Sequence, residues 1–275
     1  MEKIGILYNR GKSGAASLAD AIRWHLSKRG VEAVATDGEG EIPDGISCLV
    51  VVGGDGTLLR AARRVVGREL PLLGVNLGTL GYLAEVEAGQ FRMALDRLLE
   101  GNYTIEKRMM LEGEIFRKGV KIAEDIALND VVILRNGPLR LLEFITSVNG
   151  ERLTDYRSDG MILSTATGAT GYTLSVGGPI VTPEADLMIM TPIAAHTLAA
   201  RSIILRGRDV VRVELGIGNG YLPPEASVFF DGNEKLVSIE AGDVVEIRRA
   251  LKKTNIIKLS DASFLDVLRR KLADG

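Results

Sequence analysis

The stretch GGDGT at 53–57 is the part of the chain best suited to chemistry, because it follows an apolar run at 48–52 and precedes a segment with helical periodicity. Open α/β sheets bind ligands at such strand-to-helix turns. The glycines let a phosphate or ribose come close to the backbone, and the start of a helix offers unpaired N–H groups to an anion. A carboxylate beside a phosphate is repelled unless it accepts a proton, binds a sugar hydroxyl or holds a metal. The competing interpretation is that Asp55 only caps the helix.

Other catalytic motifs are absent from the sequence or have the wrong spacing. The segment GILYNRGKS places five residues, rather than four, between Gly5 and Gly11, and no GxGxxG follows the first apolar run, so neither a P-loop nor a dehydrogenase-type fold is supported. The two histidines have no HExxH, paired CxxC or nucleophile elbow around them, which argues against zinc hydrolysis and Ser-His-Asp chemistry. We expect His25, on an amphipathic helix, at the surface or an edge, and His196 in a structural role.

Strand and helix signals alternate over the first hundred residues, which predicts a parallel sheet covered by helices. The expected strands are 3–8, 31–36, 48–52 and 71–75, and the expected helices are 13–29, one that follows GGDGT, and 91–99. This part of the chain is therefore predicted to be a doubly wound α/β domain.

From about Tyr103 the sequence changes to short β-rich runs, which predict a β-rich domain. Asn149 and Gly150 lie between alternating apolar runs and predict a two-residue hairpin turn of the primed type. The uncharged stretch 160–183 is crowded with Gly, Thr and Ser, and we interpret it as a functional loop region.

A last helix is expected after Leu259. Its apolar stripe consists of Phe264, Leu265, Leu268 and Leu272. We expect this helix to pack back on the first domain, which gives an α/β domain of 1–102 with 259–275 and a β-rich domain of 103–258.

Length and composition predict a globular protein of about two domains. The chain has 275 residues, of which 46% are hydrophobic and 25% charged, and its net charge of -2 argues against nucleic acid or a membrane surface as a partner. No signal peptide is recognisable at the N-terminus. The single cysteine, Cys48, lies in an apolar run and is expected to be buried and inert, which favours a cytoplasmic location.

Three further stretches lie at 128–132 (LNDVV), 158–180 and 229–233 (FFDGN). Together with GGDGT at 53–57 and the segment 73–86, they resemble the NAD kinase family in order and spacing over nearly the whole chain. The resemblance implies transfer of a phosphoryl group from ATP to the 2′-hydroxyl of the adenosine ribose of NAD, which yields NADP. It also implies a Rossmann-like, phosphofructokinase-like α/β domain and a sandwich-like β domain that binds NAD.

Two alternatives remain open at this stage. Diacylglycerol-type lipid kinases share GGDGT, although the Thr-Gly-rich segment before GGPI argues against them, and a dinucleotide sensor would not need Asp55. The donor could be ATP, another nucleotide or polyphosphate. The family also implies a homodimer or homotetramer.

The resemblance assigns Asp55 as the base that accepts the hydroxyl proton. The residues that shape the phosphate-binding turn would be Gly53, Gly54, Gly56 and Thr57. No Walker lysine is evident, so Mg²⁺ carried by the nucleotide phosphates is expected to supply much of the charge neutralisation, and no metal site made by the protein is predicted.

The NAD-binding residues are likewise implied by the resemblance. Asn129 and Asp130 match an Asn-acid pair that hydrogen-bonds NAD, with Asp where the family commonly has Glu. Asp159 matches an acid that binds NAD, in one interpretation from a neighbouring subunit. The segment 165–175 matches the family's Thr-Pro-Thr-Gly-Ser-Thr-Ala-Tyr region, in which Ala166 replaces the usual proline. The candidates in this segment are Thr165, Thr167, Thr170, Gly171 (usually Ala), Tyr172, Thr173, Leu174 and Ser175.

A further group of candidates has simpler alternatives. Arg60, Arg140 and Arg157 could contact the diphosphate or ribose, or could be solvated surface charges. Asn233 stands where the family often has Gln, and Tyr82 is an aromatic residue near the site that core packing would explain almost as well.

Overall fold

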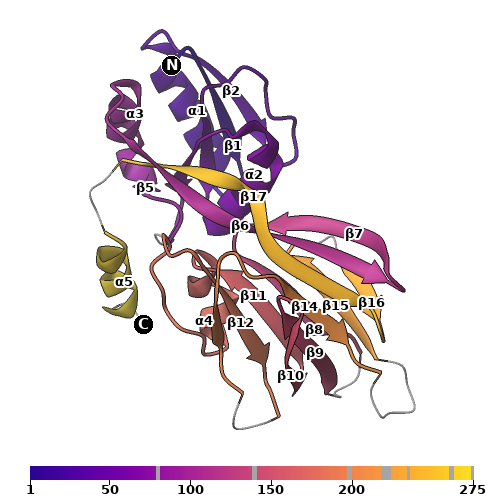
Figure 1. The fold of residues 1–275 in the computed structure, drawn as a ribbon. Coiled ribbons are helices and arrows are strands. Elements are labelled where there is room, and N and C mark those ends of the chain that lie inside the picture. The colour runs from indigo at the N-terminus through magenta and orange to yellow at the C-terminus, as the bar shows by residue number, and fades with distance from the viewer. Residues whose placement is uncertain are drawn as a thin grey trace. The chain divides into compact units, whose positions relative to one another are not determined.

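The chain forms two compact units, which we call the α/β unit (Met1–Arg108 with Lys252–Gly275) and the β unit (Met109–Leu251). The computed structural model describes residues 1–78, 81–137, 141–196, 200–217, 224–233, 236–259 and 263–273. Both boundaries between the units fall within long strands, β6 (Thr104–Arg117) and β17 (Val244–Lys258), which are labelled in Figure 1.

The α/β unit contains a parallel sheet in the order β2-β1-β3-β4. Its strands are β1 (Lys3–Tyr8), β2 (Glu32–Asp37), β3 (Leu49–Gly53) and β4 (Leu72–Asn76), with the short β5 (Val86–Glu87) beside β4. Its helices are α1 (Ala15–Ser27), α2 (Asp55–Val65), α3 (Phe91–Leu99) and α5 (Phe264–Ala273), with 3₁₀ turns η1 (Val66–Arg68) and η2 (Ala88–Gln90). The predicted strands and helices are thus confirmed. Because β1 is followed by β2 on one side and β3 on the other, the strand order reverses between β1 and β3, where ligands bind in such sheets.

His25 is an exception to the predicted pattern, because it is buried rather than at the surface. Its Nε2 lies 2.8 Å from Oδ1 of Asp96 on α3, and its ring meets the Phe91 ring edge-on. A buried imidazole is tolerated when it has such a partner. The buried face of α1 therefore includes the polar residue His25 as well as apolar residues.

The helix α5 lies where it was expected but contributes little to the core. Phe264 contacts the ring of Tyr82, with ring centroids 6.1 Å apart, which attaches α5 to the α/β unit. None of its described residues is buried, and Leu265 and Leu272 are exposed. Its apolar stripe is therefore left partly exposed.

The β unit is a sandwich of two sheets. In one sheet the order is β10-β9-β14-β17, and β17 also pairs β6, which pairs β7. The other sheet has the order β13-β12-β11-β8-β15-β16. The strands not yet given are β7 (Val120–Ala127), β8 (Asp130–Arg135), β9 (Leu142–Val148), β10 (Glu151–Ser158), β11 (Gly160–Thr165), β12 (Leu187–Ile193), β13 (Ile203–Arg206), β14 (Val211–Leu215), β15 (Glu225–Phe230) and β16 (Val237–Glu240). Both sheets contribute to one core, which includes Phe144, Ile133, Phe230, Met190 and Val213.

Two local predictions for the β unit have different outcomes. The β9–β10 hairpin turns at Asn149 and Gly150, whose φ values of 53° and 82° are those of a type I′ turn, as predicted. The interpretation of 160–183 as a loop is wrong for 160–165, which form the buried strand β11. A strand in the middle of a sheet with both faces covered needs no charged residues, which explains the uncharged sequence.

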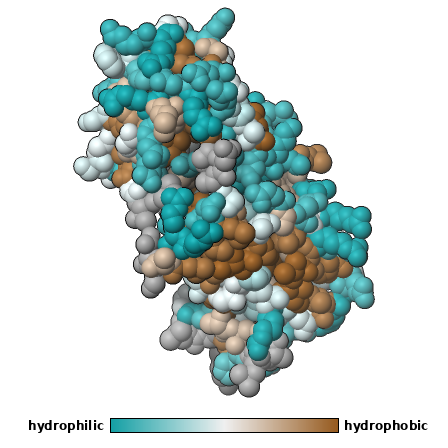
Figure 2. Space-filling model, turned by 90° about the vertical axis from the view of Figure 1, so that its left-hand side faces the viewer, coloured by the Kyte–Doolittle hydropathy of each residue, from teal (hydrophilic) through white to brown (hydrophobic). Residues whose placement is uncertain are grey.

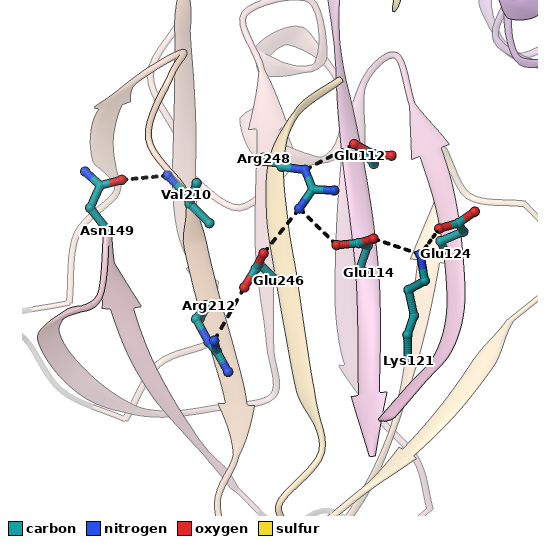
Figure 3. Close-up of polar contacts among 9 residues, drawn as sticks. All are labelled: Glu112, Glu114, Lys121, Glu124, Asn149, Val210, Arg212, Glu246 and Arg248. Atoms are coloured by element: carbon teal, nitrogen blue, oxygen red, sulfur yellow. Dashed lines mark hydrogen bonds and ion pairs between the residues drawn. The ribbon is translucent and has the colours of Figure 1, made fainter. Parts of the chain in front are cut away.

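The two sheets of the β unit carry different outer faces. Across the first sheet, Figure 3 shows a ladder in which Arg248 pairs with Glu112, Glu114 and Glu246 at 2.9–3.3 Å, and Glu114 also pairs with Lys121. Such a charged face is suited to contact with water.

On the second sheet, an apolar cluster lies on the face away from the shared core. Its members are Val132, Ile162 and Ile193, with Leu134, Val176 and Phe229 partly buried against them. Figure 2 shows apolar residues gathered over the β unit.

Candidate active site

The GGDGT turn joins β3 to α2 as predicted. Gly53 ends β3, and a Cβ there would overlap the side chain of Thr57. Gly54 is the N-cap of α2, and Asp55 is the first helical residue, with no side-chain capping bond. Capping, the competing explanation for Asp55, is therefore wrong. The buried Thr57 accepts a hydrogen bond from Nδ2 of Asn9 at 3.3 Å, so the turn is braced from the β1–α1 loop.

The carboxylate of Asp55 is held by the backbone of the segment 82–84. Oδ2 accepts the N–H of Tyr82 at 2.8 Å, and Oδ1 accepts those of Leu83 at 3.3 Å and Ala84 at 3.1 Å. A Cβ on Gly81 would overlap this carboxylate, so glycine permits the approach. Each carboxylate oxygen can accept about two hydrogen bonds. Oδ2 therefore keeps capacity to accept a hydroxyl proton while the segment holds its orientation.

Lys12 is a residue of this site that the sequence analysis missed. Because β1 and β3 are parallel neighbours (Tyr8 opposite Val52), the loop after β1 lies beside the GGDGT turn. Nζ of Lys12 is 3.0 Å from where a Cβ on Gly54 would be. Lys12 is exposed and forms no ion pair within the described ranges. The available signal was Gly-Lys-Ser at 11–13, which two residues separate from the end of β1, although its spacing from Gly5 is not that of a P-loop.

The other candidates in the α/β unit lie around the turn. Gly56 is exposed, and Arg60 is exposed on the next turn of α2. Tyr82 is half-buried, and its N–H bonds Asp55. Its ring contacts that of Phe264, and Nζ of Lys271 is 6.0 Å from its centroid.

In the β unit, the backbone at 128–130 is held by a second carboxylate. Asp231 accepts the N–H groups of Leu128 at 2.8 Å, Asn129 at 2.7 Å and Asp130 at 3.3 Å. Asp130 is buried, and its burial together with the charge of Asp231 raises the pKa of its carboxyl to about 7. Oδ1 of Asn129 is buried and has no hydrogen-bond partner among the described residues. An orphaned buried acceptor indicates a missing donor, such as a ligand hydroxyl.

The segment 165–175 packs against this loop through buried polar contacts. Oγ1 of Thr165 donates to the Leu128 carbonyl at 2.7 Å, and the Thr165 N–H bonds the Asn129 carbonyl at 2.8 Å. A Cβ on Gly168 would overlap that carbonyl. Oγ1 of Thr173 bonds Oγ of Ser164 at 2.8 Å. Thr165 and Thr173 therefore hold the segment in place.

The remaining members of the segment lie nearer the surface. It continues from β11 into η3 (Gly168–Thr170) and α4 (Tyr172–Ser175). Thr167 is buried, Thr170, Gly171 and Leu174 are half-buried, and Tyr172 and Ser175 are exposed. A Cβ on Gly171 would be 3.5 Å from Nδ2 of Asn129 and 3.9 Å from Oδ2 of Asp130. The structure thus brings the Asn-acid pair and this segment together. Asn233 is half-buried just after Asp231.

Two candidates lie at the opposite end of β11. Asp159 precedes this strand and pairs with Nε of Arg135 at 2.8 Å. At about 3.3 Å per residue, the strand separates it from Thr165 by roughly 20 Å. Arg157 is exposed and, with the exposed His196, lines a pocket of about 380 Å³. One chain therefore does not bring Asp159 or Arg157 to the Asn-acid pair. Arg140 lies outside the described residues.

In the described part of the chain, no group of three or more His, Cys, Asp or Glu side chains could hold a metal ion. Among the same residues, no helix is both long enough and apolar enough to cross a membrane. Cys48 is buried as predicted, and its burial raises the pKa of the thiol to about 12.

A glycine-rich strand-to-helix turn with an oriented carboxylate suits a phosphoryl-transferring enzyme, because that reaction depends on positioning and on a group that accepts the hydroxyl proton. The ATP-NAD kinase N-terminal domain family matches residues 9–103, and the ATP-NAD kinase C-terminal domain family matches 128–259. The chain belongs to the NAD kinase family.

This chain is similar to known NAD kinases along its whole length. The chain is 38% identical to an NAD kinase of Lachnoclostridium phytofermentans over all of both chains, and 41% identical to one of Agathobacter rectalis over 100% of this chain and 99% of that one. Its fold is similar to that of yeast NADH kinase complexed with NADH (TM-score 0.88, 22% identity, 99% of this chain and 88% of that one). It is also similar to an NAD kinase from Archaeoglobus fulgidus in complex with ATP (TM-score 0.80, 23% identity, 99% of both).

Proposed function

We propose that this protein phosphorylates the 2′-hydroxyl of the adenosine ribose of NAD with ATP as donor, which yields NADP. The observation that carries the proposal is the carboxylate of Asp55, held by three backbone N–H groups at the start of α2. The relatives named NAD kinase, and the solved structures with ATP and with NADH, support the choice of substrates.

Each unit has a proposed part in the reaction. In the α/β unit, the N–H groups of the turn and Lys12 bind the ATP phosphates, and Asp55 accepts the hydroxyl proton as the new P–O bond forms and the bond to ADP breaks. In the β unit, Asn129 and Asp130 hydrogen-bond NAD. Thr165 and Thr173 shape that site, and the more exposed Tyr172 and Ser175 are placed to contact ligand.

A divalent ion fits this proposal only when it arrives with the nucleotide. Because the described residues hold no cluster of metal ligands, they do not form a cage for Mg²⁺, whereas Mg²⁺ in kinases is commonly held by substrate phosphates and few side chains. When bound there, the ion would neutralise charge on the phosphates. We expect the reaction to require Mg²⁺ or a similar ion.

The test is to incubate the purified protein with ATP, Mg²⁺ and NAD and to detect NADP with an NADP-specific dehydrogenase. We expect NADP to form. NAD binding without NADP, with either ATP or polyphosphate, would favour the sensor. Phosphorylation of diacylglycerol with no action on NAD would favour the lipid kinase.

We also propose that the protein is a homodimer or homotetramer. Two observations support this. Asp159 and Arg157 lie a full strand away from the Asn-acid pair, so a second copy could supply them. The second sheet of the β unit also exposes an apolar side chain, Ile204, on the face away from the shared core. Most soluble oligomers are homo-oligomers with closed symmetry.

Replacing Ile204 with Arg should break the assembly. Ile204 is 54% exposed on β13 and lies opposite Ile189, on the face away from the shared core. A charge there would be desolvated in an interface, so sedimentation velocity should show monomers and the KM for NAD should rise. The matched control is Val120→Arg, which is 66% exposed on the other sheet and should leave the mass unchanged. A wild type that is monomeric and fully active would refute the oligomer.

We place the reaction in the cytoplasm. The chain has one cysteine, which cannot form an internal disulfide and is buried, as suits a reducing compartment. With a net charge of -2, we expect neither nucleic acid nor a membrane as a partner.

A further inference from the structure

We propose that Asp231 is the positioning residue of the NAD-binding pair, whose carboxylate holds the backbone at 128–130 so that the side chains of Asn129 and Asp130 face the ligand. This role rests on the proposed function. The observation behind it is the set of three N–H bonds at 2.7–3.3 Å that Asp231 accepts from three consecutive residues about a hundred positions earlier in the chain.

The local backbone aims the Asp231 carboxylate. β15 pairs with β8 up to Phe230 opposite Val131, and the chain then turns back through Asp231 and Gly232, with φ values of 53° and 63°. Aspartate and glycine tolerate this left-handed conformation better than most residues. The N–H of Asp231 bonds the Asp130 carbonyl at 3.0 Å, so the turn and the loop are joined in both directions.

An ionised carboxylate suits this position because it only accepts hydrogen bonds, and its two oxygens can accept all three N–H groups. An asparagine would offer an NH₂ group to at least one N–H group, which would push the loop away. Asp55 holds 82–84 in the same manner. The two Asp-Gly motifs therefore have different backbone conformations but use the carboxylate in the same way.

Asp231 also acts on Asp130 electrostatically. Asp130 faces Asp231 from the β15 turn, Ser164 from β11, and Gly171 from the segment 165–175, and of these only Asp231 is charged. Its charge, added to burial, raises the pKa of Asp130. Because a negative neighbour raises this pKa, removing the charge should lower it, and the pH at which NAD affinity changes should fall accordingly.

The test compares Asp231→Asn with wild type by kinetics and by calorimetry of NAD binding. We expect the KM and the dissociation constant for NAD to rise about tenfold, or about 1.4 kcal/mol. The KM for ATP should stay within twofold, and the pH midpoint of NAD affinity should move to lower pH. Hydrogen exchange at the amides of 128–130 should become faster.

Two further variants show whether an effect on NAD binding comes from positioning by Asp231, from a general loss of folding, or from the loss of a charge. Asp209→Asn is the matched control, because Asp209 is a buried acid of the same unit that bonds Asn149 and the N–H of Arg206, away from this site; it should leave NAD affinity unchanged. Asp231→Glu keeps the charge but displaces the carboxylate, so it should weaken NAD binding with little shift of the pH midpoint, and it replaces Asp231→Asn if that variant fails to fold.

NAD affinity and its pH midpoint unchanged in both Asp231 variants, or an equal loss in Asp209→Asn, would overturn the proposal. The calorimetry keeps this outcome separate from failure of the kinase function: a wild type that binds NAD without making NADP refutes the reaction but still tests Asp231. A wild type that does not bind NAD would refute both.

Discussion

Replacing Asp55 with Asn is expected to lower turnover by about 10²–10⁴-fold, or about 3–5 kcal/mol of barrier, which is the usual contribution of a general base. NAD affinity should stay within a few-fold. Because the substituted side chain would turn an NH₂ group toward at least one N–H of 82–84, the variant should also unfold at a temperature several degrees lower. Coupled NADP detection and calorimetric unfolding measure the two effects.

The Gly81→Ala variant separates the role of Asp55 as a base from its role in holding the segment 82–84. Its Cβ would overlap the Asp55 carboxylate, so the segment 82–84 must move while the base remains. We expect a loss of stability like that of Asp55→Asn but a loss of turnover of only about tenfold. Gly89→Ala, where a Cβ meets open space, is the control. Equal losses of turnover in Gly81→Ala and Asp55→Asn would contradict a role as base.

Replacing Lys12 with Ala is expected to lower kcat/KM for ATP by about 10²-fold, because a hydrogen bond between a charged group and a phosphate contributes about 1.5–3 kcal/mol. The KM for NAD should not change. Lys12→Arg should restore part of the activity, since it keeps the charge near Gly54.

The control for Lys12 is Lys28→Ala, which removes a lysine at the other end of α1. It should behave as wild type. An unchanged KM for ATP in Lys12→Ala, at low and at high salt, would exclude contact between this lysine and the phosphates.

Elements with a strong local pattern were predicted well from the sequence. β1 has the predicted bounds, and α3 contains all the apolar residues predicted to mark it, because β-branched runs and a 3.6-residue apolar period are local signals. The GGDGT turn was located correctly for the same reason. The strand β11 was missed because Ser and Thr replace part of its apolar pattern.

Partners distant in the chain could not be predicted. His25 is buried because Asp96 lies beside it, 71 positions away, and Asp231 meets Asn129 across 102 positions. Local periodicity carries no information about such pairs. The place of Lys12 could not be predicted for the same reason, since only the parallel pairing of β1 with β3 brings its loop to the GGDGT turn.

The α/β unit is discontinuous in sequence, and this has a consequence for biosynthesis. Ile256 of β17 pairs with Leu72 of β4, and Nδ2 of Asn255 bonds the Glu69 carbonyl at 2.8 Å. A ribosome must therefore translate the whole β unit before the strand that flanks β4 emerges. Until then the edge of β4 that β5 covers at Val75 and Asn76 stays unpaired at Leu72, which makes the nascent chain vulnerable to aggregation. A stop codon just before β17 would leave that edge open permanently.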